Sequence, residues 1–296
     1  MKNKTIILDF GIFQFRSIFA TLNNPTIPAT YTCLAAIIGC LKKIGVTKSD
    51  NIIIACDKGS WRKDFSKEYK ADRAEKRKKS PIDWQSEFEK MNQLLQTLDL
   101  STIFHVIKLP KIEADDIASV CCRVFKDSEI VLVSYDEDWQ LLWNYPNVKI
   151  FSPMTKRYKL KLANFNVYKL LASKIRKETS DNLVSPILNK KQYENRMKIV
   201  NLLELPEWVE QSIIAELESL EDKEENLDLI PFKSLRGRFE TLYNQDKIVT
   251  YEKCIKYEER RANKLKKGKL LKMAKVKLAK KNKKTEFKEV IDEVFK

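Results

Sequence analysis

Residues 130–138 have the sequence Ile-Val-Leu-Val-Ser-Tyr-Asp-Glu-Asp, in which a short apolar run ends at acids. A run of this length is typical of a strand buried on both faces of a parallel sheet. If the backbone stays extended past the run, its period of two residues points Asp136 and Asp138 in the same direction. The stretch therefore predicts a buried strand with two carboxylates just beyond its carboxyl end.

Three further apolar runs end in the same way. Residues 5–8 lead to Asp9, residues 52–56 lead to Asp57, and residues 103–109 lead to Glu113, Asp115 and Asp116. Segments with helical periodicity separate the runs, at residues 29–43, 84–98 and 115–126. This alternation predicts an α/β fold with a parallel central sheet flanked by helices. Because such sheets bind ligands beyond the carboxyl ends of their strands, we expect these acids to meet in one place.

The pattern changes near residue 164. Residues 1–163 are predicted to form the α/β domain, with a basic segment at about 58–80. A smaller helical region is expected at 164–245, with helices at 167–176, 191–203, 207–220 and around 232–242. A Lys-rich tail, 246–296, completes the chain, and residues 260–284 hold thirteen Lys or Arg of a chain whose net charge is +15. Three roles would explain this positive charge: contact with duplex nucleic acid, docking of a partner protein, or a solvated tail with neither function.

Composition argues against several classes of protein. The single histidine, His105, lies in a strand-like run, which disfavours a Ser-His mechanism or a His-rich zinc site. The six cysteines show no Cys-x-x-Cys spacing, so buried, reduced thiols are expected. No apolar run approaches the roughly 20 residues of a membrane helix, and a signal peptide is not evident. We therefore expect a cytoplasmic protein.

A cluster of carboxylates is unfavourable by itself. Two like charges about 4 Å apart repel by roughly 4 kcal/mol at an effective dielectric near 20. Oxygen ligands of this kind suit Mg²⁺, and Mn²⁺ can substitute. Two such ions about 3.5–4 Å apart can activate water and stabilise the leaving oxygen of a phosphodiester. Any one of these acids is explained as well by a turn or a helix cap, but the joint pattern favours a metal site.

The acids and their neighbours resemble those of the FEN-like 5′-nucleases over roughly residues 5–215. Glu113-Ala114-Asp115-Asp116 resembles the acidic helix start of that family, and Ser134–Asp138 resembles its Ser-x-Asp-x-Asp strand end. Ser180-Asp181-Asn182 looks like the third acidic motif. The phage branch, the ribonucleases H of T-even bacteriophages, is the most similar, through residues 61–65 and 145–154.

The resemblance implies metal-ligand or metal-water roles for Asp9, Asp57, Glu113, Asp115, Asp116, Asp136, Asp138 and Asp181. Glu178 stands where the family has an aspartate, so it keeps the charge on a longer arm. In this scheme Asp136 and Asp138 share one ion with Asp115 and Asp116, while Asp181 binds the second ion with Asp138. Asp9, Asp57 and Asp136 would also be catalytic. Residues 183–191 hold no glycine, so the glycine-rich, potassium-binding hairpin of many relatives is not expected.

Residues 61–79, which we call the arch, interleave aromatic rings with cations. Cations neutralise phosphates and rings stack on unpaired bases, although a solvated helix explains the charge equally well. The resemblance implies that this segment bridges the active site. It implies nucleic-acid contacts for Arg62, Lys63, Tyr69, Lys70 and Arg73. Lys70 and Arg73 would be catalytic, because a cation at the scissile phosphate stabilises charge in the transition state.

The expected function is that of a metal-dependent 5′-3′ exonuclease or flap endonuclease. Its expected substrates are RNA–DNA hybrids and duplex or 5′-flap DNA, with removal of RNA primers in replication. The resemblance adds a single-stranded-DNA-binding protein and a sliding clamp as partners. We expect a monomer, located in the host cytoplasm if the protein is encoded by a phage. Two alternatives stay open, a PIN-type ribonuclease acting on free RNA and a non-catalytic binder of branched DNA.

Overall fold

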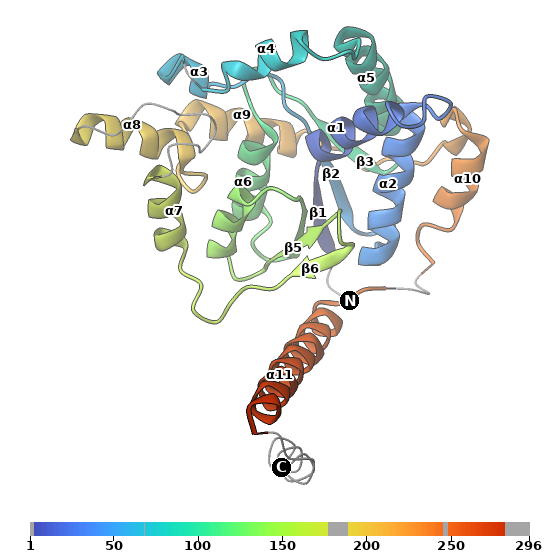
Figure 1. The fold of residues 1–296 in the computed structure, drawn as a ribbon. Helices are drawn as coiled ribbons and strands as arrows, with labels where there is room; N and C mark the ends of the chain where they lie inside the picture. The colour runs from blue at the N-terminus through green and yellow to red at the C-terminus, as the bar shows by residue number, and fades with distance from the viewer. Residues whose placement is uncertain (1–2, 68, 177–188, 245–247, 282–296) are drawn as a thin grey trace. The chain divides into compact units, whose positions relative to one another are not determined.

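The structure is a computed structural model that describes residues 3–67, 69–176, 189–244 and 248–281. The chain divides into two compact units, Met1–Val249 and Thr250–Lys296. The first unit contains the sheet and every helix up to α10 (Figure 1). The sequence-based boundary near residue 164 therefore falls inside one compact unit.

The centre of the first unit is a six-stranded sheet with the order β3-β2-β1-β4-β5-β6. Its strands are β1 (Lys4–Asp9), β2 (Asn51–Ala55), β3 (Phe104–Ile107), β4 (Glu129–Val133), β5 (Val148–Ser152) and β6 (Arg157–Lys159). The first five are parallel, and β6 pairs antiparallel with β5. The expected α/β fold with a central parallel sheet is confirmed, and β5 and β6 extend it beyond the four strands predicted.

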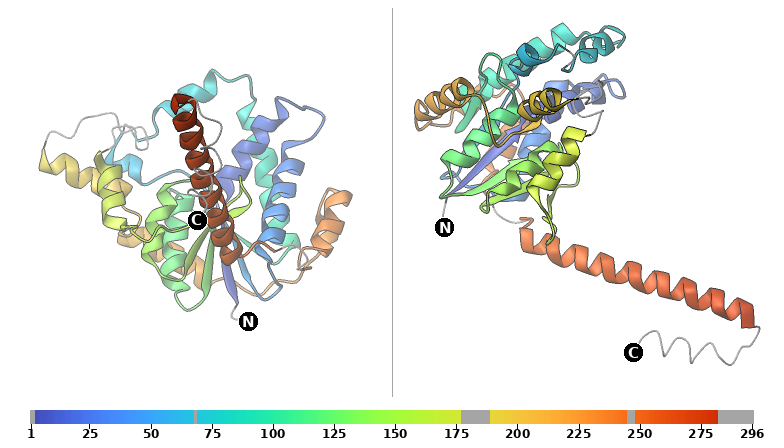
Figure 2. Two further views of the ribbon diagram at one scale, coloured as in Figure 1. Left: turned by 60° about the horizontal axis from the view of Figure 1, so that its bottom comes forward. Right: turned by 90° about the vertical axis from the view of Figure 1, so that its left-hand side faces the viewer.

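Helices cover both faces of the sheet (Figures 1 and 2). The face that carries Ile7, Ile53 and Leu132 belongs to a continuous core with α6 (Ala114–Val124) and the 3₁₀ helix η1 (Asp138–Asn144). Three later helices close this side, α7 (Val167–Arg176), α8 (Lys190–Val200) and α9 (Glu207–Glu218). The other helices of this unit with three or more turns are α1 (Phe10–Thr21), α2 (Ala29–Ile44) and α5 (Trp84–Ser101).

The segment after α9 crosses to the other face. Residues 221–244, which we call the strap, include the short helix η3 (Leu227–Leu229) and α10 (Lys233–Glu240). The Lys223 ammonium donates to the Phe104 carbonyl of the edge strand β3 at 3.0 Å, and the Phe239 ring packs on the Phe104 ring at 5.8 Å. The Asn226 N–H donates to the Ser101 carbonyl at 2.9 Å. The expected helix near 232–242 is thus present, but it packs apart from α7, α8 and α9.

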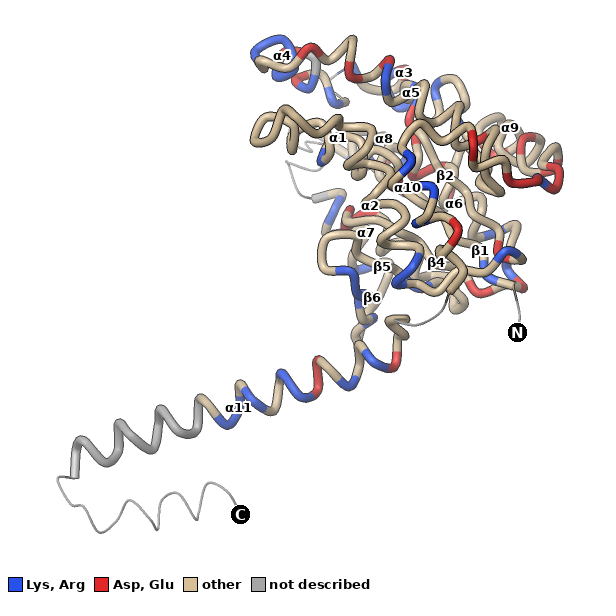
Figure 3. Tube along the Cα trace, turned by 90° about the vertical axis from the view of Figure 1, so that its right-hand side faces the viewer, with Lys and Arg blue, Asp and Glu red and all other residues tan. Residues whose placement is uncertain are grey.

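The second unit begins with α11 (Tyr251–Lys281), a single helix within the described residues. This helix lies within the segment 246–296 that the sequence indicated as a Lys-rich tail. Figure 3 shows Lys and Arg recurring along it, and Lys264, Lys266 and Lys267 are exposed. No helix in the described part of the chain is long and apolar enough to cross a membrane.

Candidate active site

Carboxylates from separate segments gather beyond the carboxyl ends of β1, β2, β3 and β4. Asp9 ends β1, and the Ser134 hydroxyl donates to its Oδ2 at 3.0 Å. The same hydroxyl accepts the Asp136 N–H at 3.0 Å, and the Asp138 N–H donates to Asp136 Oδ1 at 2.8 Å. Ser134 therefore ties the end of β4 to the end of β1, which positions three of the predicted acids.

The N-terminus of α6 holds two more of these acids. The Ala114 N–H, in the first turn of α6, donates to Asp57 Oδ1 at 2.8 Å. A helix N-terminus favours negative charge, and this bond lowers the pKa of Asp57, but desolvation has the larger effect and raises this pKa above its usual value. On the same turn, Asp115 Oδ1 accepts the Trp139 indole N–H at 2.5 Å. The turn from β3 into α6 thus brings Asp57 and Asp115 to the same edge of the sheet.

The acids act on one another electrostatically. Desolvation raises the pKa of Asp9 to about 7, with further increases from Asp57 and Asp136. Desolvation and the charge of Asp136 raise the pKa of Asp115 well above its usual value. Desolvation and Asp138 raise the pKa of Asp136. Like charges raise carboxyl pKa values only at short range, so the acids of four segments do share one site.

Two lysines oppose this negative charge. Lys70 of the arch donates to Glu113 Oε1 at 2.5 Å, and Lys174 of α7 forms an ion pair with Asp138. Burial alone would raise the pKa of Glu113, but Lys70 and Arg62 hold this pKa below its usual value. Sequence reasoning did not single out Lys174, because a lysine in an amphipathic helix gives no signal of its partner.

Among the described residues, no group of three or more acidic, histidine or cysteine side chains is arranged to hold a metal ion. The chemistry of the donors nevertheless fits Mg²⁺ or Mn²⁺, since every acid supplies hard oxygen ligands at a sheet edge that needs positive charge. Glu178 and Asp181 lie outside the described residues.

Three predicted site residues are buried in a different role. Arg62 is 2% exposed and forms ion pairs with Glu113 at 2.8 Å and with Asp116 at 2.7 Å. The Tyr69 hydroxyl, also buried, donates to Glu113 Oε2 at 2.8 Å. Both oxygens of Asp116, which is 0% exposed, accept from Arg62, and the Trp61 indole N–H and the Glu113 N–H also donate to Oδ2. The expectation that Arg62 and Tyr69 contact nucleic acid does not fit this geometry. Nor does a metal-ligand role for Asp116, because its buried oxygens are already bonded to Arg62, Trp61 and the Glu113 N–H.

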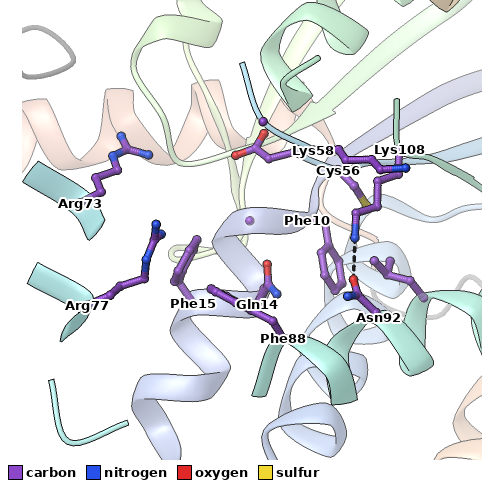
Figure 4. A pocket seen from close by; sticks show the side chains of 14 residues that line it. Phe10, Gln14, Phe15, Cys56, Lys58, Arg73, Arg77, Phe88, Asn92 and Lys108 are labelled. Atoms are coloured by element: carbon purple, nitrogen blue, oxygen red, sulfur yellow. Dashed lines mark hydrogen bonds between the residues drawn. The ribbon is translucent and has the colours of Figure 1, made fainter. Parts of the chain in front are cut away.

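Other residues of the arch are exposed to solvent. It contains the short helices α3 (Arg62–Phe65) and α4 (Asp72–Lys78), and both Lys63 and Arg73 are exposed. Arg73 and Arg77 border a cavity of about 440 Å³ that reaches Asp57. In Figure 4 these two arginines enter from one side and Lys58 and Lys108 from the other, with the rings of Phe10, Phe15 and Phe88 between them. The cavity thus joins cations and aromatic rings to the carboxylate edge.

The comparisons with known proteins agree with this geometry. Ribonuclease H of Enterobacteria phage T4 is 35% identical over 119 residues, which are 40% of this chain and 39% of that protein. A structure of the 5′-exonuclease of bacteriophage T5 with divalent zinc bound has a TM-score of 0.54 at 18% identity, and the match covers 81% of this chain and 100% of that one. A T5 flap endonuclease with DNA and metal ions has a TM-score of 0.50 at 17% identity, with 82% and 100% covered.

At these identities the two T5 structures show a shared fold, and the phage T4 relative is matched over less than half of its length. The family match is broader. Residues 4–172 match the N-terminal, resolvase-like domain of 5′-3′ exonucleases, and this segment is more than half of the 296 residues. The chain therefore belongs to the 5′-3′ exonuclease family of nucleases.

Proposed function

We propose that the chain is a divalent-metal-dependent 5′-nuclease that hydrolyses phosphodiesters near the 5′ ends of RNA–DNA hybrids and of duplex or 5′-flap DNA. The observation that carries the proposal is the gathering of Asp9, Asp57, Asp115 and Asp136, from four segments, at one edge of the sheet. Removal of RNA primers in replication is the role we infer, since the phage T4 relative is a ribonuclease H.

The acids that carry metal-ligand roles in this proposal are Asp9, Asp57, Glu113, Asp115, Asp136, Asp138, Glu178 and Asp181. Two bound Mg²⁺ ions, for which Mn²⁺ can substitute, would supply an activated water and stabilise the leaving oxygen. The chain itself orients the ligands through Ser134, Trp139 and the first turn of α6. The solved T5 relatives that hold zinc, or DNA and metal ions, support this assignment.

The nucleic-acid strand is proposed to lie against the arch. Lys63 and Arg73 are exposed there, and Arg73 and Arg77 overlook the cavity beside Asp57. Cations of this kind neutralise phosphates, and half-buried rings such as Phe15 and Phe88 offer faces to unpaired bases. The cavity is therefore suited to a single-stranded 5′ arm that leads to the carboxylates.

The deciding experiment is a cleavage assay on 5′-labelled flap DNA, RNA–DNA hybrid and free RNA, each with Mg²⁺ and with EDTA. We expect short 5′ products from flap and hybrid substrates with Mg²⁺ and none with EDTA. Cleavage of free RNA alone would favour a PIN-type ribonuclease. Tight binding of flaps without cleavage in Mg²⁺ or Mn²⁺ would favour a non-catalytic binder of branched DNA.

Lys70→Ala should lower the single-turnover rate by about 10²-fold or more while weakening binding much less. The Lys70 ammonium lies 2.5 Å from Glu113 at the edge of the acid cluster, where a cation can meet the scissile phosphate. Quench-flow assays and equilibrium binding on the same flap separate the two effects. Lys63→Ala, an exposed lysine of the same arch, is the control and should lower affinity alone. Equal loss of affinity on flaps and plain duplexes, with an unchanged rate, would make Lys70 an ordinary backbone contact.

Deleting residues 250–296, the second unit, should weaken binding and flatten its salt dependence while turnover at saturating substrate stays the same. Each phosphate contact that is lost removes about 0.9 from the slope of log K against log salt on duplex DNA. Replacing Lys264, Lys266 and Lys267 by Gln keeps the chain length and tests charge alone. An unchanged slope in both variants would mean that α11 does not bind nucleic acid. Docking to a sliding clamp or a single-stranded-DNA-binding protein would then be the leading role.

A further inference from the structure

We propose that the Lys174 ammonium competes with a divalent cation for Asp138 and moves aside when an ion binds there. This inference rests on the metal dependence proposed above. Lys174 is a lysine of α7 whose side chain is only 10% exposed, and its ammonium is bonded to Asp138 Oδ1. Asp138 is itself 18% exposed, so the pair is largely shielded from water.

The ammonium and a metal ion oppose each other at Asp138. An ammonium bonded to a carboxylate oxygen opposes a divalent cation at the same oxygen, because the two positive charges would then lie within a few ångströms of each other. The charge of Lys174 also acts on Asp136 and opposes the rise in its pKa. If the ammonium moved away, Asp136 and Asp138 would both lose this neutralising charge. A metal ion would restore the neutralisation.

Two neighbouring lysines form bonds of a different kind from that of Lys174. Lys159 lies beside the same turn, but it donates to the carbonyls of Tyr135 at 3.0 Å and Asp136 at 3.4 Å. Lys161 donates to the Trp143 carbonyl at 2.7 Å. Neither of these bonds involves a carboxylate oxygen. The bond of Lys174, by contrast, is to a carboxylate oxygen that is proposed to bind metal.

The withdrawal is expected to be a side-chain movement. Leu171 and Ile175 of α7 are buried in the core that α7 shares with α6 and η1. These anchors hold the backbone of the helix, while the four-carbon stem of Lys174 gives its ammonium several ångströms of reach. Metal binding is thus coupled to the rotamer of one lysine and leaves α7 in place.

The test measures metal binding directly on the full chain. Mn²⁺ is titrated into wild-type, Lys174→Met and Lys161→Met proteins, and free Mn²⁺ is followed by electron paramagnetic resonance. Lys174→Met should bind Mn²⁺ at least about fivefold more tightly, the lower end of typical coupling between two sites. Its melting temperature should fall in EDTA and recover with Mn²⁺. Lys161→Met should leave the Mn²⁺ affinity unchanged, and Lys174→Arg, which keeps the charge, should bind nearly as wild type does.

Equal or weaker Mn²⁺ binding by Lys174→Met would overturn the inference, and weaker binding would mean that Lys174 positions Asp138 for the metal. If Lys174→Met does not fold, Lys174→Gln is titrated in the same way with the same criterion. A wild-type protein that binds no Mn²⁺ would refute the proposed metal dependence together with this inference. A wild-type protein that binds Mn²⁺ and cleaves flaps, beside a Lys174→Met variant of unchanged affinity, would refute the inference alone.

Discussion

Asp136→Asn is expected to abolish metal-dependent cleavage, with a loss of at least about 10³-fold in single-turnover rate, while the fold stays intact. The substitution removes one ligand charge from the edge of the sheet. It keeps the Oδ1 atom that accepts the Asp138 N–H and the backbone N–H that donates to Ser134, so the turn after β4 retains its hydrogen bonds.

The same substitution should raise the melting temperature in EDTA. Desolvation and the charge of Asp138 raise the pKa of Asp136 above its usual value. A carboxyl group whose pKa is higher in the folded state than in the unfolded state costs stability when it is ionised, that is, at a pH above its folded pKa. A neutral amide removes this cost. Asp127→Asn, an exposed acid before the other end of β4, should change neither activity nor melting. Near-wild-type cleavage by Asp136→Asn would refute its role as a ligand.

Arg62→Met should destabilise the chain by about 3–5 kcal/mol, because it leaves the buried carboxylate of Asp116 without its counter-ion and removes one of the two cations that pair with Glu113. The Arg62 guanidinium also donates to the Ile199 carbonyl at 2.8 Å, so the arch loses its link to α8 as well. Denaturation in urea measures the change. Lys63→Met, at the exposed neighbouring position, should stay within about 0.5 kcal/mol of wild type.

A second variant separates a structural role of Arg62 from a role in binding. In Arg62→Met/Asp116→Leu the buried charge at residue 116 is gone, so part of the lost stability should return. If Arg62→Met were as stable as wild type and bound flap DNA more weakly, Arg62 would be a nucleic-acid contact after all. The sequence-based expectation that Arg62 contacts nucleic acid would then be correct, although the side chain is buried in the structure.

The sheet and the gathering of acids could be predicted because they depend on local patterns. An apolar run that ends at Asp9, Asp57 or Asp136 indicates both a strand and the edge at which its acid lies. Strand β6 has only three residues and the sequence Arg-Tyr-Lys, so it carries no apolar run to detect. Its pairing with β5 depends on the register of the neighbouring strand, which the sequence does not display.

The roles of Arg62 and Lys174 could not be predicted, because each depends on a distant partner. Arg62 stands beside exposed Lys63 in a basic segment, and its burial follows from Asp116, which lies 54 residues away. Lys174 lies 36 residues from Asp138. A charge pattern alone cannot separate a cation that meets a phosphate from one that neutralises a buried acid.

The strap has a consequence for the order in which the chain is made. It covers the edge strand β3 through Lys223 and Phe239, and the Val249 N–H donates to the Lys43 carbonyl at the end of α2. A ribosome releases β3 and α2 long before it releases these residues. During this interval the β3 edge of the nascent sheet is uncovered, and uncovered edge strands pair with other chains. Synthesis that stalls before residue 221 yields a polypeptide in which Asp9, Asp57, Asp115 and Asp136 are already made while the β3 edge of the sheet is still uncovered.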